Sequence, residues 1–388
     1  MSDSTRFEPD YALGAGEHLG NVLAELGMSQ SDLAARTGIS PKHINQLIKK
    51  NLPVTPETAT QLEYATNIDA ETWMSLDARY QALHAHQKTR QRLTADLDWL
   101  DQFNLKELAK RSVIPTADKS VDTLEALLRF FGISDTQGWN RVWQPSMATF
   151  RQSPSFRPDT TPTTIWLRTG QLAAQSVRTR PYDQRALVAE ISELRTLTRL
   201  EPSAGLDRAR DVLAGVGVAL VLVAEFDRCH ASGATWWASK DKAVVMLSNR
   251  GKREDRLWFT LFHELGHLLL HAKRGTFIDT NGDSTVDGDG PPWAGPAPSS
   301  GFIDDGSRDS VIEQEADDYA SDTLIPRAHR ASIAHLRSEA DVNTLADAIG
   351  VSAGIVAGRY QYETQNYRNF NKLRRTVPHE LFLNPTSW

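Results

Sequence analysis

One stretch of the chain, Trp258 to His271, constrains the fold most, because it combines a helical pattern with a metal-binding motif. It reads WFTLFHELGHLLLH, and its leucines recur at three- and four-residue spacing, which predicts an amphipathic helix. Within it, His263, Glu264 and His267 form the pattern H-E-x-x-H. On a helix this pattern places two imidazoles on one face and a carboxylate beside the first, which predicts a zinc site with its own general base. The competing interpretation is an ordinary amphipathic helix with exposed histidines.

A third protein ligand is expected on a second helix further along the chain. Glu313 and Asp317 lie one turn apart in the pattern E-x-x-x-D, so Glu313 can complete the coordination sphere while Asp317 orients a liganding imidazole through its other nitrogen. Glu315 is the alternative third ligand, because it lies near the start of the same helix. His271 shares the face of the two histidines, and we expect it beside the metal ligands or at the surface. Three protein ligands leave one position for water.

The N-terminal region has the pattern of a helix-turn-helix. Helical segments at 17–26 and 29–36 precede a turn at Gly38, and a third helix begins at Ser40 and Pro41, residue types preferred at a helix start. The buried side of this helix is expected to contain Ile39, Ile44, Leu47 and Ile48. The polar side chains left exposed, which can reach base edges and phosphates in a major groove, are Lys42, His43, Asn45, Gln46 and Lys49.

Charge leaves two interpretations of this region open. Residues 1–95 contain nine Lys and Arg against eleven Asp and Glu, and the formal net charge of the chain is −6, so any contact with double-stranded DNA must come from a local surface. The alternative is a helical bundle that contacts proteins. The run GISPKHINQLIKK, followed by Leu62-Glu63 and Trp73…Tyr80, resembles the XRE-type helix-turn-helix of HigA-like antitoxins over residues 10–90. Double-stranded DNA is the expected partner.

The middle of the chain shows no chemical motif. Residues 84–144 have a helical apolar pattern in which Trp139 and Trp143 are expected to be core residues, and the Pro-, Ser- and Thr-rich segment 151–162 marks a boundary. Two helices are predicted over 165–200. Apolar strands at 215–223 and 243–248 predict a small sheet beside the metal helix.

A family resemblance rests on two runs of this region. GATWWASKDKAVVMLSNRGKREDRLWFTLFHELGHLLLH, followed by EQEADDYASDTLIP, resembles the ImmA/IrrE metallopeptidase group, intracellular zinc peptidases often joined to XRE helix-turn-helix domains, over Trp166 to Arg359. The resemblance implies His263, His267 and Glu313 as zinc ligands and Glu264 as the base. It also implies a protein substrate of the repressor or antitoxin type.

The expected fold is multidomain and mainly α, with a zincin-like α+β domain that contains the small sheet. We expect four parts: a helix-turn-helix domain at 1–83, a helical connector at 84–150, a metallopeptidase domain at 151–365 and a basic C-terminal tail at 366–388. The tail is expected to form a solvated face. Residues 345–356 repeat the apolar pattern of residues 33–44 without its polar side chains, which predicts a packing or substrate-docking copy.

Residues 276–309 between the two metal motifs are dense in Asp, Gly, Pro and Ser. They predict a long surface loop, which we expect to act as a lid over the cleft. Its segment 279–287 resembles the start of a calcium loop, although Ser284 replaces the turn glycine and Gly290 the closing acid. The single cysteine, Cys229, excludes an internal disulfide framework. With no membrane-spanning apolar run and no signal-peptide pattern, a cytoplasmic protein without membrane contact is expected.

The favoured hypothesis is a cytoplasmic zinc endopeptidase coupled to a DNA-binding regulatory module, in which Glu264 accepts a proton as water attacks the scissile carbonyl. The alternative is a DNA-binding transcriptional regulator or antitoxin whose metal site is structural or sensory. The base distinguishes the two, because a closed structural site has four protein ligands and needs no Glu264. Homodimerisation stays open.

Overall fold

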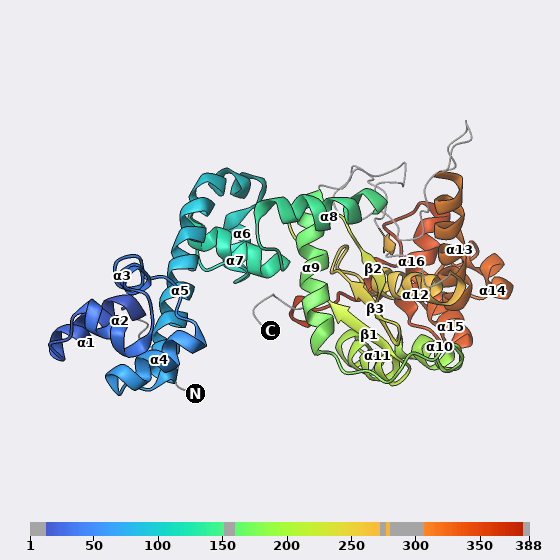
Figure 1. The fold of residues 1–388 in the computed structure, drawn as a ribbon. Coiled ribbons are helices and arrows are strands. Elements are labelled where there is room, and N and C mark those ends of the chain that lie inside the picture. Colours follow the sequence, from blue (N-terminus) through green and yellow to red (C-terminus); the bar gives the residue numbers. More distant parts are fainter. Residues whose placement is uncertain (1–12, 151–159, 272–276, 280–305, 383–388) are drawn as a thin grey trace. The chain divides into compact units, whose positions relative to one another are not determined.

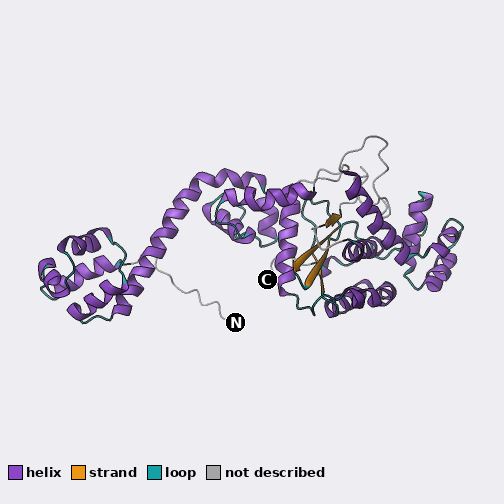
Figure 2. Cartoon of the chain, turned by 45° about the vertical axis from the view of Figure 1, so that its right-hand side comes forward, coloured by secondary structure: helices purple, strands orange, loops and turns teal. Residues whose placement is uncertain are grey.

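The computed structural model describes residues 13–150, 160–271, 277–279 and 306–382 (Figure 1). The chain divides into two compact units, Met1–Asp98 and Trp99–Trp388. Helices dominate both units, and the described strands all lie in the C-terminal one (Figure 2). The prediction of a mainly α architecture with a small sheet in the C-terminal part is therefore confirmed.

The N-terminal unit is a bundle of helices around one apolar core. The largest fully buried side chains of this core include Trp73, Leu33 and Leu47. Gly16 lets the first helix approach the third, because a Cβ at this position would lie 1.8 Å from the Leu47 carbonyl oxygen. The helices are α1 (Ala15–Glu25), α2 (Gln30–Thr37), α3 (Pro41–Lys50), α4 (Pro56–Thr66) and α5 (Ala70–Leu93).

Local sequence signals set the geometry of α2 and α3. Ser29 and Asp32 form a reciprocal capping box at the start of α2, and Gly38 ends this helix in the left-handed conformation, with φ 77°. The hydroxyl of Ser40 then accepts a hydrogen bond from the His43 backbone N–H, 3.2 Å away, and α3 begins at Pro41. The helix-turn-helix prediction is confirmed, including the turn at Gly38 and the start of α3 at Ser40 and Pro41, while the capping box of Ser29 and Asp32 was not predicted.

The C-terminal unit begins with short helices around an aromatic cluster. Trp139 makes edge contacts with Trp99, Phe103 and Phe131, and Trp143 contacts Phe131. Both tryptophans of the connector are thus core residues, as predicted. The helices are η1 (Thr94–Gln102), which begins in the N-terminal unit, α6 (Leu105–Lys110), α7 (Val121–Phe131) and α8 (Thr136–Phe150).

Arg111 joins this helical part to the sheet region. Its guanidinium donates hydrogen bonds to the carbonyl oxygens of Ala224 and Glu225 and lies 3.9 Å from the centroid of the Phe226 ring. Burial lowers the pKa of the guanidinium below its usual value, opposed by the nearby Glu107 carboxylate. Within the C-terminal unit, the connector helices are therefore attached to the segment that follows the first strand.

A four-stranded sheet lies at the centre of the C-terminal unit. Its order is β1 (Val218–Leu222), β3 (Lys242–Leu247), β2 (Gly233–Ser239) and β4 (Phe277–Asp279). β1 pairs with β3 in parallel, whereas β2 pairs antiparallel with both β3 and β4. β1 lies within the strand predicted at 215–223, and β3 matches the strand predicted at 243–248 with a shift of one residue. β2 and β4 were not predicted. The expectation of a loop throughout 276–309 is wrong at β4 and at residues 306–309, which begin the helix Gly306–Leu324.

Helices pack on both faces of this sheet. α12 (Glu254–Leu270) contacts β2 and β3 on one face, while Gly170 of α9 (Thr160–Ser176) packs against Met246 on the other. The helices α10 (Gln184–Leu197) and α11 (Pro202–Gly215) precede β1, and α11 packs against it. Figure 1 shows α12 beside α13 (Gly306–Leu324), its main helical partner. The two helices predicted over 165–200 are confirmed as α9 and α10.

The chain ends in a second helix-turn-helix-like pair. α14 (Arg327–Ile333) leads to α15 (Glu339–Ile349), and after the left-handed Gly350 the hydroxyl of Ser352 caps α16 (Ala353–Thr364). Most of the first nine residues of α16 are buried, so this helix is unsuited to a DNA groove. This burial agrees with a packing role for the copy, while substrate docking stays a prediction.

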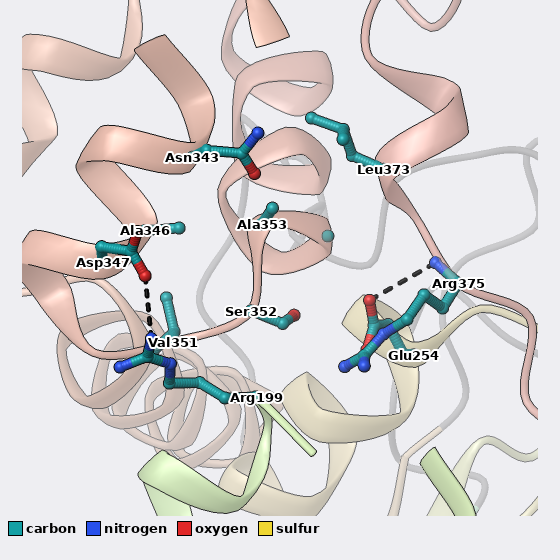
Figure 3. Close-up of a pocket in the computed structure, with 11 residues that line it drawn as sticks. Arg199, Glu254, Asn343, Ala346, Asp347, Val351, Ser352, Ala353, Leu373 and Arg375 are labelled. Atoms are coloured by element: carbon teal, nitrogen blue, oxygen red, sulfur yellow. Dashed lines mark hydrogen bonds and ion pairs between the residues drawn. The ribbon is translucent and has the colours of Figure 1, made fainter. Parts of the chain in front are cut away.

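The expectation that the basic tail forms a solvated face is wrong for Arg374 and Arg375. Arg374 is 5% exposed, and it donates hydrogen bonds to Asp255 (3.0 Å) and Gln361 (2.7 Å). Arg375 pairs with Glu254, as Figure 3 shows, at the start of α12. These arginines fold back because two carboxylates, buried at the first turn of α12, require positive partners. The tail is therefore bound to the first turn of α12.

Other predictions fall outside the described residues. These are the lid and the calcium-like segment, which lie in 276–309 apart from β4 and the start of α13. Among the described residues, no single helix is both long and apolar enough to cross a membrane, although α15 and α16, as a bent pair, meet the criterion by length and composition.

Candidate metal centre

The two histidines of the motif lie on α12, where every residue from Leu257 to Leu268 is buried. The expectation of an amphipathic helix with one buried side is therefore wrong, because neighbouring elements cover this helix on all sides. His263 is 2% exposed and His267 1%, and their Nε2 atoms lie 3.0 Å apart. One helical turn separates them, so both imidazoles point in one direction, as the spacing predicts. Gly266, between them, lies against α13, because a Cβ there would approach Tyr319 within 3.2 Å and the Ala316 Cα within 3.3 Å.

α13 brings two carboxylates to the same imidazole. Glu313 Oε2 lies 3.2 Å from Nε2 of His263, and Glu313 Oε1 lies 3.6 Å from Nε2 of His267. Asp317, one turn further on, places Oδ1 2.8 Å from Nδ1 of His263. Each nitrogen of the His263 ring therefore faces a carboxylate, one at the metal position and one behind the ring.

The donor set fits a zinc ion. One ligand atom from each of His263, His267 and Glu313 lies within 4.8 Å of the others, and this is the group with metal-ligand geometry among the described residues. Tetrahedral zinc with bonds of about 2.0–2.1 Å separates its ligand atoms by about 3.3 Å. The two Nε2 atoms lie 3.0 Å apart, and the two oxygens of Glu313 lie near that separation from them, with Oε2 3.2 Å from His263 and Oε1 3.6 Å from His267. Two imidazoles and one carboxylate are also a ligand set that leaves a coordination position open.

The surroundings of His267 and Glu313 favour the protonation states in which these side chains can bind a metal. Burial lowers the pKa of His267 below its usual value, against an opposing hydrogen bond with Glu313, so the imidazole is neutral near pH 7. Burial alone would raise the pKa of Glu313, but hydrogen bonds with His263 and His267 outweigh it and leave this pKa well below its usual range. A neutral imidazole and an ionised carboxylate are the forms that bind metals.

His271 and Glu315 form a separate pair behind His267. Nδ1 of His271 lies 3.0 Å from Nδ1 of His267, and Nε2 of His271 lies 3.1 Å from Glu315 Oε2. His271 is the residue that follows the end of α12, so its backbone is already extended. The structure thus brings Glu313 to the two motif histidines and Glu315 to His271.

Glu264, which follows the candidate ligand His263 on α12, is fully buried. The hydroxyl of Thr235 on β2 donates a hydrogen bond of 2.5 Å to Oε2 of Glu264. Gly233, two residues earlier on the same face of the strand, lies against the other carboxylate oxygen, since a Cβ there would be 2.4 Å from Oε1. Sequence reasoning missed both residues, because β2 was not predicted and neither has a motif of its own.

The predicted DNA-contacting residues share one side of α3. Ile44 and Leu47 are buried, and Ile48 is partly buried, so the apolar side of the helix is the predicted one. The polar side chains are exposed at Lys42, Asn45 and Lys49 and partly exposed at His43 and Gln46. This side of the helix is therefore available for contacts, whereas α16, its counterpart in the C-terminal unit, is covered.

Cys229 takes no part in the metal centre. Its thiol is buried, and burial raises the thiol pKa to about 11, with a smaller opposing effect of hydrogen bonds. A thiol in this state is a poor metal ligand and nucleophile at neutral pH. Cys229 is therefore a small buried residue of the core, with 2% of its surface exposed.

Comparison with known families identifies two parts of the chain. Residues 221–288 match the family model of the IrrE N-terminal-like domain, a family of M78 peptidases, and this match includes His263, Glu264 and His267 but ends before Glu313. Residues 20–73 match the helix-turn-helix family model. No curated protein matches the chain. The chain thus contains a segment similar to a helix-turn-helix and a segment similar to the IrrE N-terminal-like domain of M78 peptidases, in the order that the sequence predicts.

Proposed function

We propose that the protein is a zinc endopeptidase in which His263, His267 and Glu313 hold the metal and Glu264 is the general base. The observation that carries this proposal is the three-residue ligand set together with the fully buried Glu264, which directly follows the ligand His263 on α12. A closed structural zinc site would use a fourth protein ligand, and it would have no need of a buried carboxylate beside the metal. The alternative of a structural or sensory site is therefore the weaker one.

The residues of the site divide the work of peptide hydrolysis. Zinc bound there supplies Lewis-acid chemistry and a lowered pKa for water. Glu264 accepts a proton at its carboxylate when water attacks the scissile carbonyl, and it returns this proton to the leaving amine. Asp317 holds the His263 ring through Nδ1, and His271 does the same for His267.

The test compares the proteins cleaved in cells by the wild type with those cleaved by Glu264→Gln. New peptide ends seen by mass spectrometry with the wild type alone would support a peptidase. Glu264→Gln is expected to retain about one zinc ion, whereas the double variant His263→Ala/His267→Ala is expected to lose it. Identical peptide ends from both proteins, with zinc retained, would favour a structural or sensory metal. Full zinc occupancy in the double variant would contradict the site itself.

We further propose that the substrate is a repressor or antitoxin-like protein and that the helix-turn-helix directs the enzyme to DNA in the cytoplasm. The family resemblance supports the substrate class, and the exposed polar side of α3 supports DNA contact through Lys42, His43, Asn45, Gln46 and Lys49. A homodimer would suit a two-fold operator.

DNA binding is tested with the full chain in a selection from random duplexes. Asn45→Ala/Gln46→Ala is expected to weaken specific binding, since each lost bidentate base contact costs about 1–3 kcal/mol. Lys49→Ala should instead weaken all sequences alike and flatten the salt dependence. If the selection enriches no sequence, the N-terminal unit is a bundle for protein contacts.

A further inference from the structure

The Glu264 carboxylate lies against strand β2. β2 presents Gly233 and Thr235 to α12, because residues two apart on a strand share a face. Thr235 contacts Oε2 of the carboxylate, and the space above Oε1 exists only because residue 233 has no side chain. Thr260, one turn before Glu264, bounds the same space, 2.6 Å from where a Cβ of residue 233 would lie. Each oxygen therefore meets a different residue of β2.

The Thr235 hydroxyl has two acceptors within reach, and their distances decide between them. The backbone carbonyl oxygen of Glu264 is 3.4 Å away, at the limit of a hydrogen bond, whereas carboxylate Oε2 is 2.5 Å away. The single hydroxyl proton therefore goes to the carboxylate. Thr235 is 2% exposed and Glu264 fully buried, so both partners of this bond lie in the protein interior.

We propose that Thr235 is a positioning residue that holds the Glu264 carboxylate in its working orientation, with Gly233 leaving the room for it. The proposal rests on the proposed peptidase function. Fixing a general base matters because proton transfer requires a defined distance to the reacting water. A hydroxyl also suits both states of the base, since it can donate to the carboxylate and accept from the carboxylic acid after the proton has moved.

The β2 register keeps this arrangement in place. Thr235 pairs with Val245 of β3 on one side and with Phe277 of β4 on the other, so its backbone is held in the interior of the sheet. A one-residue slip would turn Thr235 to the opposite face, toward α9. The carboxylate is thus oriented by the sheet, although its own residue belongs to the helix.

The test uses three variants of the full chain and one matched control. Thr235→Val keeps the shape and removes the hydroxyl, Thr235→Ser restores the hydroxyl, and Gly233→Ala pushes a methyl group against Oε1. The control is Thr169→Val, which removes another buried threonine hydroxyl, bonded to the Ile165 carbonyl oxygen at 2.9 Å within α9. Zinc content and melting temperature show whether each variant folds and retains its metal.

Two measurements decide the proposal. Crystal structures of the metal-free variants should show the Glu264 carboxylate turned away in Thr235→Val and in Gly233→Ala, and unchanged in Thr235→Ser. On a fluorogenic peptide that spans a cleavage site found for the wild type, Thr235→Val should lower kcat roughly 10- to 100-fold with little change in KM, below the total contribution of about 10²- to 10⁴-fold for a general base. Thr235→Ser should restore most of this rate, and Thr169→Val should leave it unchanged.

An unchanged Glu264 orientation with an unchanged kcat in Thr235→Val would overturn the proposal, as would a Thr235→Ser variant that stays as slow as Thr235→Val. If Thr235→Val does not fold, Gly233→Ala still tests the proposal, because its methyl group would displace the carboxylate at Oε1; an unchanged carboxylate orientation with an unchanged kcat in Gly233→Ala would overturn it. If the wild type cleaves no protein, the peptidase function fails, while the crystal structures still show whether Thr235 orients the carboxylate.

Discussion

Removing the Asp317 carboxylate should weaken zinc binding without removing a metal ligand. Asp317 Oδ1 lies 2.8 Å from Nδ1 of His263, and this nitrogen points away from the metal position. The carboxylate fixes the ring and raises its basicity, and loss of such a partner typically costs 10- to 100-fold in metal affinity. We therefore expect Asp317→Ala to lose about 1.4–2.7 kcal/mol of zinc binding free energy.

The neighbouring residue supplies the control. Asp318 has the same charge, but it is exposed and its carboxylate accepts a hydrogen bond from Gln314, 3.1 Å away. Competition with a chromophoric chelator at pH 7 measures the zinc dissociation constant of each variant. Equal losses in Asp317→Ala and Asp318→Ala would refute the reasoning, because they would show a general effect of negative charge on α13. An unchanged affinity in Asp317→Ala would also refute it.

Three further outcomes are expected. Glu313→Ala should weaken zinc binding more than Glu315→Ala in the same competition assay, and the reverse order would move the ligand to Glu315. In urea unfolding, Arg374→Met should lower the free energy of unfolding by about 3–5 kcal/mol, because it leaves the buried Asp255 carboxylate without its partner. The control Arg208→Met breaks an exposed pair with Glu193, in which 56% and 40% of the side chains are accessible, and should cost less than about 1 kcal/mol. Because burial raises the thiol pKa to about 11, Cys229 should resist iodoacetamide at pH 8 in the native protein and react only after unfolding, as mass spectrometry would reveal.

Several features could be predicted because their causes are local. The spacing of His263 and His267 fixes their common direction on any helix, and the apolar residues around them predict a helix. The periodicity did not show that this helix is buried on all sides from Leu257 to Leu268, because that depends on the elements packed around it. Ser40 and Gly38 act on the backbone within a few residues, so the start of α3 follows from the sequence. The helix-turn-helix and the H-E-x-x-H helix were therefore found without knowledge of the fold.

Which of Glu313 and Glu315 faces the histidines depends on helix packing. Glu313 and Glu315 are two residues apart, which turns them by about 200° around a helix with 3.6 residues per turn. Which one faces the histidines depends on how α13 is rotated against α12, and that rotation is set by packing such as the contact of Gly266 with Tyr319. The sequence left both open, and the packed structure brings Glu313 to the imidazoles and Glu315 to His271.

Other features depended on tertiary structure alone. The basic tail was expected to be solvated because no acidic partner for Arg374 is evident from the neighbouring sequence. Its partner Asp255 lies 119 positions away in the chain. Thr235 gave no signal because a threonine in a short, unpredicted strand acquires its role only when the sheet places it against Glu264, 29 positions later. The metal-binding chemistry of α12 follows from the sequence, because neighbouring residues supply both the ligand types and their spacing. The orientation of the Glu264 carboxylate and of the His263 ring depends on the tertiary structure, because their partners Thr235 and Asp317 come from distant segments that meet only through packing.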